Sequence, residues 1–487
     1  MSKRPATLPL MLKPRPADAT ATRWLADALR SEILCGSLGP GARLPSTREL
    51  SAQYQLSRGT VVNVFEQLRS EGYLVGSVGS GTRVSAILPD DLLRPFRDEP
   101  SAPPAPPARV FAKFSTRVSL FNAVSTRPMR AFRACQPALD LFPIDLWTQV
   151  ASRRLRRATV ADLLGTEPFG YLPLREAIAD YLRTSRGVQC TAEQVAVVSG
   201  MQEALDLVTR LVLDPGDRVA VEEPTYNGAI RVFEAVGAKV VSIPTDDEGI
   251  TVGGARWRNV KLAYVTPAHQ YPLGMGMSLC RRLELLEWAR LHGAMLFEDD
   301  YDAEYRYRGH PVPALQGLDR HGVVFFSGTF SKVLFPALRL GYLVVPEDLI
   351  DRVTMAKSVV TRHAPLLDQA TVADFISEGH FGRHLRRMRE VYAERLGTLL
   401  ESGRQELAGL LDISDIEAGL QTVGYIVGAQ TGLEVEQGAL KHDVEVTSLS
   451  RFARGALPRE GIQLGFAAVD VPEIRRGVTG LARVLGA

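Results

Sequence analysis

A single lysine follows a strongly apolar stretch, in a position that would present its amine. Val323–Phe326 is an apolar run of strand length, Gly328-Thr329 turns the chain, and Ser331-Lys332 follows. Arg339 comes seven residues after the lysine. This arrangement could place a reactive amine beside an anion. Because most lysines are solvated surface charges, the interpretation needs support from other segments.

Three upstream segments also place polar or aromatic residues directly after an apolar run. Ser199-Gly200-Met201 opens a helical pattern, where free backbone N–H groups suit a phosphate, although a Ser-Gly helix start is also common without a ligand. Tyr226 is either a stacking ring or ordinary packing. The acidic cluster Glu298–Asp302 is either a solvated turn or a buried group that needs a cationic partner.

The elements that must position these residues alternate between strand-like and helical patterns. This alternation predicts an α/β fold with a mainly parallel sheet covered by helices, and ligands at the carboxyl ends of its strands. The expected strands are 194–198, 218–221, 239–243, 261–265, 295–297, 323–326 and 340–345, and the expected helices include 202–213, 226–236 and 278–291.

Together, these residue types describe a pyridoxal 5'-phosphate site. Lys332 would form the Schiff base with the cofactor, and Asp299 would keep the pyridine nitrogen protonated. Tyr301 would donate a hydrogen bond to the ring oxygen, and Tyr226 would stack on the ring. The residues expected to hold the phosphate are Ser199, Gly200, Met201, Thr329, Ser331 and Arg339.

The first 85 residues predict a smaller DNA-binding unit. One helix is expected over 22–34, Ser46-Thr47 is expected to cap a second helix, and Ser57 a third. Two short helices joined by a tight turn form a helix-turn-helix, whose second helix can lie in the DNA major groove. The segments 73–75 and 82–84 predict a two-stranded wing.

Charge supports this division of the chain. Residues 1–85 hold eleven Lys and Arg against six Asp and Glu, whereas the rest holds 46 against 49. A basic unit ahead of a slightly acidic one is expected if the first contacts a polyanion.

The smaller unit resembles the winged helix-turn-helix of the GntR family. The residues that carry the resemblance are Gly36–Leu38, Pro40-Gly41, Leu44–Leu50, Ser57–Val61, Glu71–Tyr73 and Gly79–Thr82. The resemblance implies double-stranded DNA as a partner, contacted by Arg48, Arg58 and the glycine turn of the wing at Gly81. Ser57 and Thr60 lie at the start of the same helix, where Thr60 could reach a base edge or a phosphate. Each arginine alone could instead be a solvated charge.

A proline-rich segment separates the two units. Seven prolines lie between Pro89 and Pro107, which predicts an extended spacer. We therefore expect a DNA-binding domain over residues 18–87, a linker over 88–112 and a cofactor-binding domain over 113–487.

The larger domain resembles fold-type I aminotransferases, and the whole chain resembles the MocR-type regulators of the GntR family. The residues that carry this resemblance are Gly170–Arg175, Ser199–Gln202, Val221–Pro224, Val265–Gly274, Glu298–Asp302, Gly328–Lys332 and Arg339–Tyr342. The resemblance implies a homodimer in which Tyr171 reaches the phosphate of the partner's cofactor. It also implies that His269 or Gln270 touches the ring, and that the effector is an amino compound or pyridoxal phosphate itself.

One position departs from the aminotransferase pattern. In those enzymes a C-terminal strand supplies an arginine that binds the substrate α-carboxylate through two hydrogen bonds. Here the strand is 461–467, and Gln463 stands where the arginine is expected. Either Arg451 or Arg454 substitutes from the preceding turn, or the effector carries no α-carboxylate.

Other classes of protein find less support. Four scattered cysteines have neither a disulfide framework nor metal-ligand spacing, and we expect no metal site. Without a signal peptide or membrane span, the sequence favours a cytoplasmic location. We expect an effector-sensing transcriptional regulator with at most an aminotransferase half-reaction. The alternatives are an active aminotransferase with an accessory DNA-binding unit, and a regulator whose larger domain only dimerises.

Overall fold

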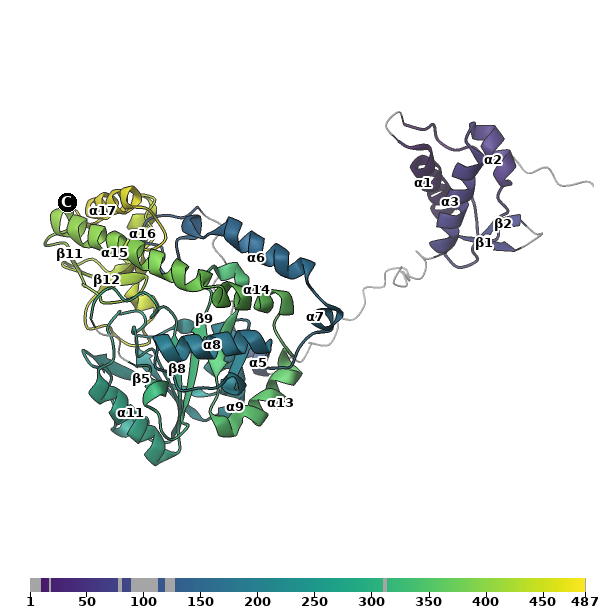
Figure 1. Cartoon of the computed structure of the whole chain (residues 1–487). Coiled ribbons are helices and arrows are strands. Elements are labelled where there is room, and N and C mark those ends of the chain that lie inside the picture. The colour runs from purple at the N-terminus through teal and green to yellow at the C-terminus, as the bar shows by residue number, and fades with distance from the viewer. Residues whose placement is uncertain are drawn as a thin grey trace, which may run out of the picture. The chain divides into compact units, whose positions relative to one another are not determined.

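The computed structural model describes residues 10–16, 19–77, 81–88, 113–118, 128–309 and 313–486. The chain divides into two compact units, Met1–Arg109 and Val110–Ala487 (Figure 1). All but the first residue of the expected linker, 88–112, lies outside the described residues.

The described part of the smaller unit contains three helices and a two-stranded hairpin (Figure 1). Side-chain oxygens of Thr20, Ser46 and Ser57 cap the three helices by accepting backbone N–H groups. Apolar side chains from all five elements form one core, which includes the fully buried Leu29 and Leu68. The elements are α1 (Ala21–Leu34), α2 (Thr47–Tyr54), α3 (Arg58–Ser70), β1 (Leu74–Ser77) and β2 (Gly81–Val84).

An eight-stranded sheet forms the centre of the larger unit. Its order is β3-β10-β9-β8-β7-β4-β5-β6, in which β9, β8, β7, β4 and β5 run parallel. The predicted α/β class and mainly parallel sheet are therefore confirmed, although β10 is antiparallel to both of its neighbours. The strands are β3 (Val195–Val198), β4 (Arg218–Glu223), β5 (Lys239–Asp246), β6 (Gly249–Ile250), β7 (Val260–Val265), β8 (Met295–Asp300), β9 (Val324–Thr329) and β10 (Gly341–Val344).

Helices cover both faces of this sheet because its strands are apolar on both sides. Val198 and Phe325 pack into one cluster, and Val197 and Phe326 into another. The first cluster lies under α9 (Met201–Val212) and α10 (Asn227–Val236). The other described helices of the larger unit before residue 380 are α5 (Lys113–Arg117), α6 (Ile144–Arg156), α7 (Val160–Leu164), α8 (Leu172–Ser185), α11 (Leu279–His292), α12 (Leu315–Leu318), α13 (Ile350–Val360) and α14 (Leu366–Ser377).

A second, four-stranded antiparallel sheet lies towards the C-terminus, in the order β11-β12-β14-β13. A Cβ at Gly465 would lie 2.2 Å from the Arg133 carbonyl oxygen, so the backbone around Arg133 passes directly over this sheet. The strands are β11 (Leu411–Ile413), β12 (Gln421–Ile426), β13 (Thr447–Ser448) and β14 (Gly461–Gly465), and the nearby helices are α15 (His380–Glu406), α16 (Gly432–Leu440) and α17 (Val471–Leu485).

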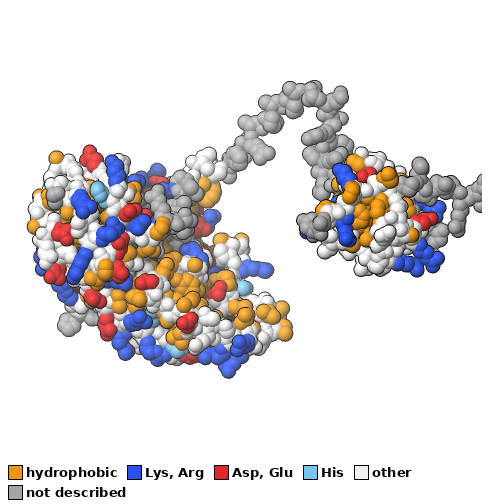
Figure 2. Space-filling view, turned by 90° about the horizontal axis from the view of Figure 1, so that it is seen from above, with side chains coloured by type: hydrophobic (Ala, Val, Ile, Leu, Met, Phe, Trp, Pro, Cys, Tyr) orange, Lys and Arg blue, Asp and Glu red, His pale blue; other side chains and the backbone are white. Residues whose placement is uncertain are grey.

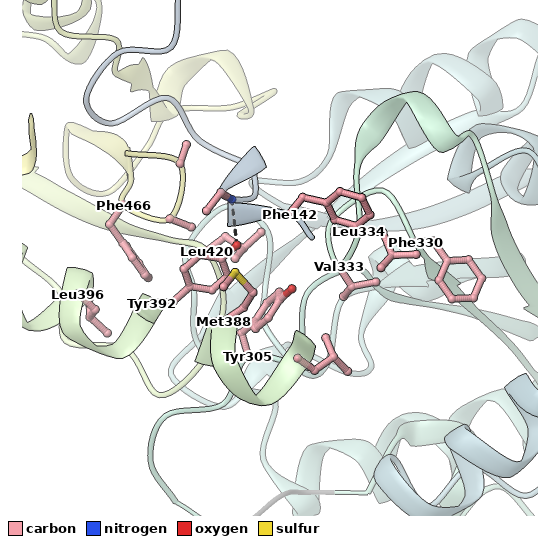
Figure 3. Packing of buried hydrophobic residues seen from close by; sticks show 14 of the residues in the cluster. Phe142, Tyr305, Phe330, Val333, Leu334, Met388, Tyr392, Leu396, Leu420 and Phe466 are labelled. Atoms are coloured by element: carbon pink, nitrogen blue, oxygen red, sulfur yellow. Dashed lines mark hydrogen bonds between the residues drawn. The ribbon is translucent and has the colours of Figure 1, made fainter. Parts of the chain in front are cut away.

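The turn that carries Lys332 is anchored in the largest hydrophobic cluster. Phe330, Val333 and Leu334 are at most 2% exposed and belong to the cluster that also contains Met388 (Figure 3). Packing on both sides of the lysine therefore fixes the backbone from which its side chain extends.

No helix in the described part of the chain is long and apolar enough to cross a membrane. Among the same residues, no group of three or more His, Cys, Asp or Glu side chains could hold a metal ion. Cys35, Cys135, Cys190 and Cys280 are all free thiols.

Candidate functional site

Asp299 lies at the carboxyl end of β8, in the middle of the large sheet. The carboxyl group is buried, and its Oδ2 accepts a 2.6 Å hydrogen bond from the Tyr264 hydroxyl on the neighbouring strand β7. Its other oxygen, Oδ1, is buried without a hydrogen-bond partner. An unpaired buried carboxylate oxygen is costly, so this position suits a ligand that donates a hydrogen bond.

The protonation of Asp299 reflects this burial. Desolvation raises the pKa of Asp299 to about 7, against the opposing effect of the Tyr264 hydrogen bond. The nearby carboxyl groups of Asp300, Asp302 and Glu222 raise it further. A cationic donor at Oδ1 would lower this pKa and keep the carboxylate charged.

Two chain turns that were expected to hold a phosphate lie side by side. Gly341 on β10 pairs with Val198 at the end of β3 and with Thr329 at the end of β9. The ends of β3 and β9 therefore lie on either side of Gly341. Gly200 has φ 131°, and a Cβ there would lie 3.3 Å from Nη2 of Arg339. Only glycine therefore keeps the guanidinium this close to the start of α9.

Other polar groups at this corner are already engaged. The Ser199 backbone N–H donates to Glu203 Oε2 at 2.6 Å, and Glu203 also pairs with the buried Lys357. The Ser331 backbone N–H donates to the Thr329 hydroxyl at 3.1 Å. The structure thus gathers the predicted phosphate residues Ser199, Gly200, Met201, Thr329, Ser331 and Arg339 at two adjacent turns.

Lys332 contacts a segment that was not predicted. Its Nζ donates a 2.6 Å hydrogen bond to the Cys135 carbonyl oxygen. Cys135 has φ 60°, a left-handed conformation that costs a non-glycine residue about 1 kcal/mol. Its backbone N–H and its thiol both donate to Gln421 Oε1, at 2.8 and 2.9 Å. These contacts link the lysine to the four-stranded sheet.

Three tyrosines form an aromatic group beside these residues. The Tyr271 ring contacts Tyr226 and Tyr301 edge to face, with centroids 5.8 and 5.6 Å apart. Burial raises the pKa of Tyr226 to about 12, with a further rise from Asp299 and an opposing effect of Arg339. Tyr226 therefore lies within electrostatic reach of both the carboxylate and the guanidinium.

The structure separates the roles of His269 and Gln270. The Gln270 amide donates to the backbone carbonyls of Pro224 and Tyr271, and its Oε1 accepts the Leu273 N–H. Its side chain therefore stabilises the surrounding backbone. His269 Nδ1 lies 2.9 Å from both Asp302 Oδ1 and the Tyr301 hydroxyl. Its Nε2 is buried without a partner. His269 is thus the member of the pair that touches a predicted site residue.

Tyr171 lies apart from this group. Its backbone N–H donates to Gln369 Oε1 at 2.8 Å, and the Arg154 guanidinium lies 6.0 Å from its ring centroid. In the described part of this single chain, its side chain makes no hydrogen bond with Lys332 or Arg339.

Gln463 is buried on β14, at 1% exposure, and its Nε2 has no hydrogen-bond partner. The two arginines that could have replaced its missing charge are engaged elsewhere. Arg451 pairs with Glu436 at 2.7 Å, and Arg454 pairs with Glu234 at 2.7 Å. Neither guanidinium is left unpaired.

Four residues of this site were missed from the sequence: Cys135, Tyr264, Tyr271 and Gln421. Tyr264 could have been found if the order of the strands were known, because it is opposite Phe297, two residues before Asp299 on the same face. Cys135 and Gln421 are 286 residues apart, and no local pattern connects them.

In the smaller unit, the predicted DNA-contacting residues divide into two kinds. The Ser57 and Thr60 hydroxyls are 2.8 Å apart, and Ser57 Oγ also accepts the Thr60 N–H, so both support the start of α3. Arg48 and Arg58 are exposed and have no hydrogen bond or ion pair among the described residues. Gly81 begins β2 with φ 85°.

Two basic residues that were not singled out from the sequence, Arg43 and Arg69, lie against the wing. A Cβ at Gly81 would lie 3.1 Å from the Arg43 guanidinium, and Arg69 Nη2 donates to the Thr82 hydroxyl at 2.9 Å. Both arginines are exposed, and Lys and Arg side chains are visible on the surface of this unit in Figure 2. Arg69 lies in the last turn of α3, so it connects the second helix of the helix-turn-helix with the hairpin.

Comparison with known families assigns both units. The model for bacterial regulatory proteins of the gntR family matches residues 22–84, and the model for aminotransferase class I and II matches residues 140–414. The probable rhizopine catabolism regulatory protein MocR of Rhizobium meliloti is 39% identical, over 97% of this chain and 95% of its own length. The pyridoxine biosynthesis transcriptional regulator PdxR of Corynebacterium glutamicum is 31% identical, over 96% and 97%.

Solved structures resemble the larger unit. An α-aminoadipate aminotransferase of Thermus thermophilus, complexed with N-(5'-phosphopyridoxyl)-L-leucine, is 28% identical with a TM-score of 0.69, over 77% of this chain and 97% of its own. A kynurenine aminotransferase of Pyrococcus horikoshii, in complex with PMP, is 27% identical with a TM-score of 0.68, over 74% and 91%.

Proposed function

This chain belongs to the MocR-type regulators of the GntR family, and we propose that it regulates transcription in response to a small-molecule effector through pyridoxal 5'-phosphate. The smaller domain, residues 18–87, binds double-stranded DNA, residues 88–112 form the linker, and residues 113–487 bind the cofactor and the effector. The observation that best supports the proposal is Asp299 Oδ1, which is buried without a hydrogen-bond partner at the carboxyl end of β8.

The residues of the larger unit fit this cofactor. When bound, pyridoxal 5'-phosphate supplies a carbonyl carbon that condenses with amines and a ring that accepts electrons. Lys332 would provide the attaching amine, and Asp299 Oδ1 would accept a hydrogen bond from the protonated ring nitrogen, which supplies the partner that this oxygen lacks. Tyr226 packs on the ring and Tyr301 donates to its oxygen, while His269 positions Tyr301.

The phosphate is held by the two adjacent turns. Arg339 supplies the positive charge, and the α9 N-terminus at Gly200 and Met201 supplies free N–H groups. The residues assigned to this role are Ser199, Gly200, Met201, Thr329, Ser331 and Arg339.

An exposed apolar surface supports the proposed homodimer. Leu164 on α7 is 83% exposed and Val359 on α13 is 86% exposed. The ends of these helices meet, since a Cβ at Gly165 would lie 2.7 Å from His363 Nε2. Hydrophobic side chains are also visible on the face of the larger unit in Figure 2. Clustered exposed apolar residues typically mark a protein interface, and a second copy would bring the partner's Tyr171 to the phosphate.

Analytical ultracentrifugation tests the homodimer. Leu164→Asp should convert a dimer into a monomer, because a charge would be buried at the interface. Leu291→Asp, at an exposed position on α11, is the matched control and should leave the dimer intact. A dimer that survives Leu164→Asp would contradict this interface.

Absorbance titration tests cofactor binding. Adding pyridoxal phosphate to the purified protein should produce the band of the protein-bound cofactor, and Lys332→Ala should abolish it because the attaching amine is lost. The control is Lys441→Ala, which removes an exposed lysine after α16 and should leave the band unchanged. If wild-type protein forms no band, or Lys332→Ala retains it, the proposed site is wrong.

A further inference from the structure

Two buried amide groups face the segment that carries Cys135. Gln421 and Gln463 are each 1% exposed, and the Nε2 atoms of both lack hydrogen-bond partners. In the register of β12 and β14, Gln421 is opposite Gly465, so Gln421 and Gln463 are diagonal neighbours on one face of the sheet. Gln421 Oε1 accepts both the N–H and the thiol of Cys135.

These amides lie near the amine of Lys332. The lysine Nζ donates to the Cys135 carbonyl, and the Cys135 thiol lies 3.8 Å from the Tyr271 hydroxyl. Burial raises the pKa of Tyr271 well above its ordinary value, and Cys135 adds to this rise. The Gln463 side chain opposes the rise, so its amide lies near the Tyr271 hydroxyl, although Nε2 does not reach the geometry of a hydrogen bond. A ligand whose amine approaches Lys332 would therefore present its other groups to Gln421 and Gln463.

Among the described residues around Gln421 and Gln463, the side chains are polar but offer no unpaired positive charge to receive a carboxylate. The arginines on the segments around these glutamines are each paired with a carboxylate: Arg133 with Glu445, Arg451 with Glu436, and Arg454 with Glu234. A carboxylate buried here would lose its hydration without gaining an ion pair, whereas a hydroxyl oxygen would accept an amide hydrogen bond without that cost.

Building on the proposed function, we propose that the effector is a primary amine that carries a neutral oxygen acceptor, such as a hydroxyl group, in place of a carboxylate. Its amine engages the cofactor at Lys332, and its oxygen accepts hydrogen bonds from Gln421 and Gln463. The two unpaired Nε2 atoms thus select against amino acids and in favour of amino alcohols.

Three amines with one carbon skeleton test this selection. L-alanine, L-alaninol and isopropylamine each carry a primary amine on the same branched carbon, with a carboxylate, a hydroxymethyl group or a methyl group beside it. Each is titrated into the cofactor-loaded full chain, and the half-maximal concentration is measured from the cofactor absorbance and, independently, from the rise in melting temperature. Alaninol should act at a concentration about 3–10-fold lower than either of the others, as expected for one net hydrogen bond.

Variants of Gln463 assign the effect to this residue. Gln463→Leu should weaken the response to alaninol and bring it closer to that of isopropylamine, because only Gln421 would still donate. Gln463→Arg should reverse the preference to favour alanine, because a guanidinium binds a carboxylate through two hydrogen bonds. Gln437→Leu, at an exposed position on α16, is the matched control and should change nothing. Far-UV circular dichroism checks that each variant is folded.

The outcomes separate this proposal from the one on which it rests. Absence of a cofactor band in wild-type protein would overturn both. A normal band with a preference for alanine, or with equal responses to alaninol and isopropylamine, would overturn only the selection proposed here. An unchanged preference in the folded Gln463→Arg variant would also overturn it.

Discussion

The two units place their functional residues in opposite ways. In the smaller unit, Arg48 and Arg58 are exposed and unpaired among the described residues, and they stand on helices capped by their own neighbours. In the larger unit, Asp299 and Lys332 lie beside groups from distant parts of the chain, and Asp299 Oδ1 is buried without a partner. The exposed arginines of the smaller unit need no further partner for the fold, whereas Asp299 Oδ1 lacks a hydrogen-bond partner that a bound ligand would supply.

Replacing the buried acceptor should give the largest effect on binding. Asp299→Asn removes the charge that would hold the ring nitrogen, and should weaken pyridoxal phosphate binding by about 1.5–3 kcal/mol, on the order of 10–150-fold. Absorbance titration measures this affinity. Asp247→Asn, an exposed residue in the turn after β5, is the matched control. Equal affinities for Asp299→Asn and wild type would mean that this carboxylate does not contact the cofactor.

Without cofactor, Asp299→Asn should be more stable than wild type. Because burial raises the pKa of Asp299 to about 7, the folded state holds its proton more tightly than the unfolded state, and this group lowers stability as the pH rises from about 4 to 7. The effect depends on its neighbours Tyr264, Asp300, Asp302 and Glu222. Cofactor-free Asp299→Asn should therefore exceed wild type in unfolding free energy by about 1–3 kcal/mol near pH 8 and by less near pH 5.5, as measured by urea denaturation.

We expect these opposite effects, weaker cofactor binding but higher stability without cofactor, only in the larger unit. A variant that is less stable than wild type at both pH values would show that Asp299 is needed for the fold itself, not for a ligand.

Features that depend only on adjacent residues could be predicted from the sequence. The helix caps Ser46 and Ser57 and the strand-end residues Asp299 and Lys332 are each marked by a local pattern. Contacts that depend on the order of the strands could not be predicted from the sequence. Tyr264 meets Asp299 only because β7 and β8 are neighbours, and Cys135 meets Lys332 only because a left-handed backbone turns its carbonyl towards the amine.

In the smaller unit, replacing an exposed arginine should weaken DNA binding without destabilising the fold. Arg58→Ala should weaken binding to the cognate duplex by about 1–3 kcal/mol, since it removes a base or phosphate contact without disturbing the core. Fluorescence anisotropy over a range of salt concentrations measures the change. Arg352→Ala, an exposed arginine on α13 of the larger unit, is the control. Unchanged affinity of Arg58→Ala for its cognate site would overturn the assignment of α3 as the recognition helix.

Ser57 offers the finest distinction between a structural and a DNA-contacting residue. Its hydroxyl accepts the Thr60 N–H at 3.0 Å, so Ser57→Ala should destabilise the smaller unit by about 1 kcal/mol through loss of the cap. Ser57→Asp keeps a capping oxygen and should retain most of that stability, but its negative charge would lie at the end of α3 that approaches phosphate. If this position faces DNA, Ser57→Asp should bind DNA more weakly than Ser57→Ala in anisotropy measurements, although it is the more stable of the two in thermal denaturation. If the two variants bind equally, Ser57 acts only as a helix cap, and the DNA-contacting surface begins at Arg58.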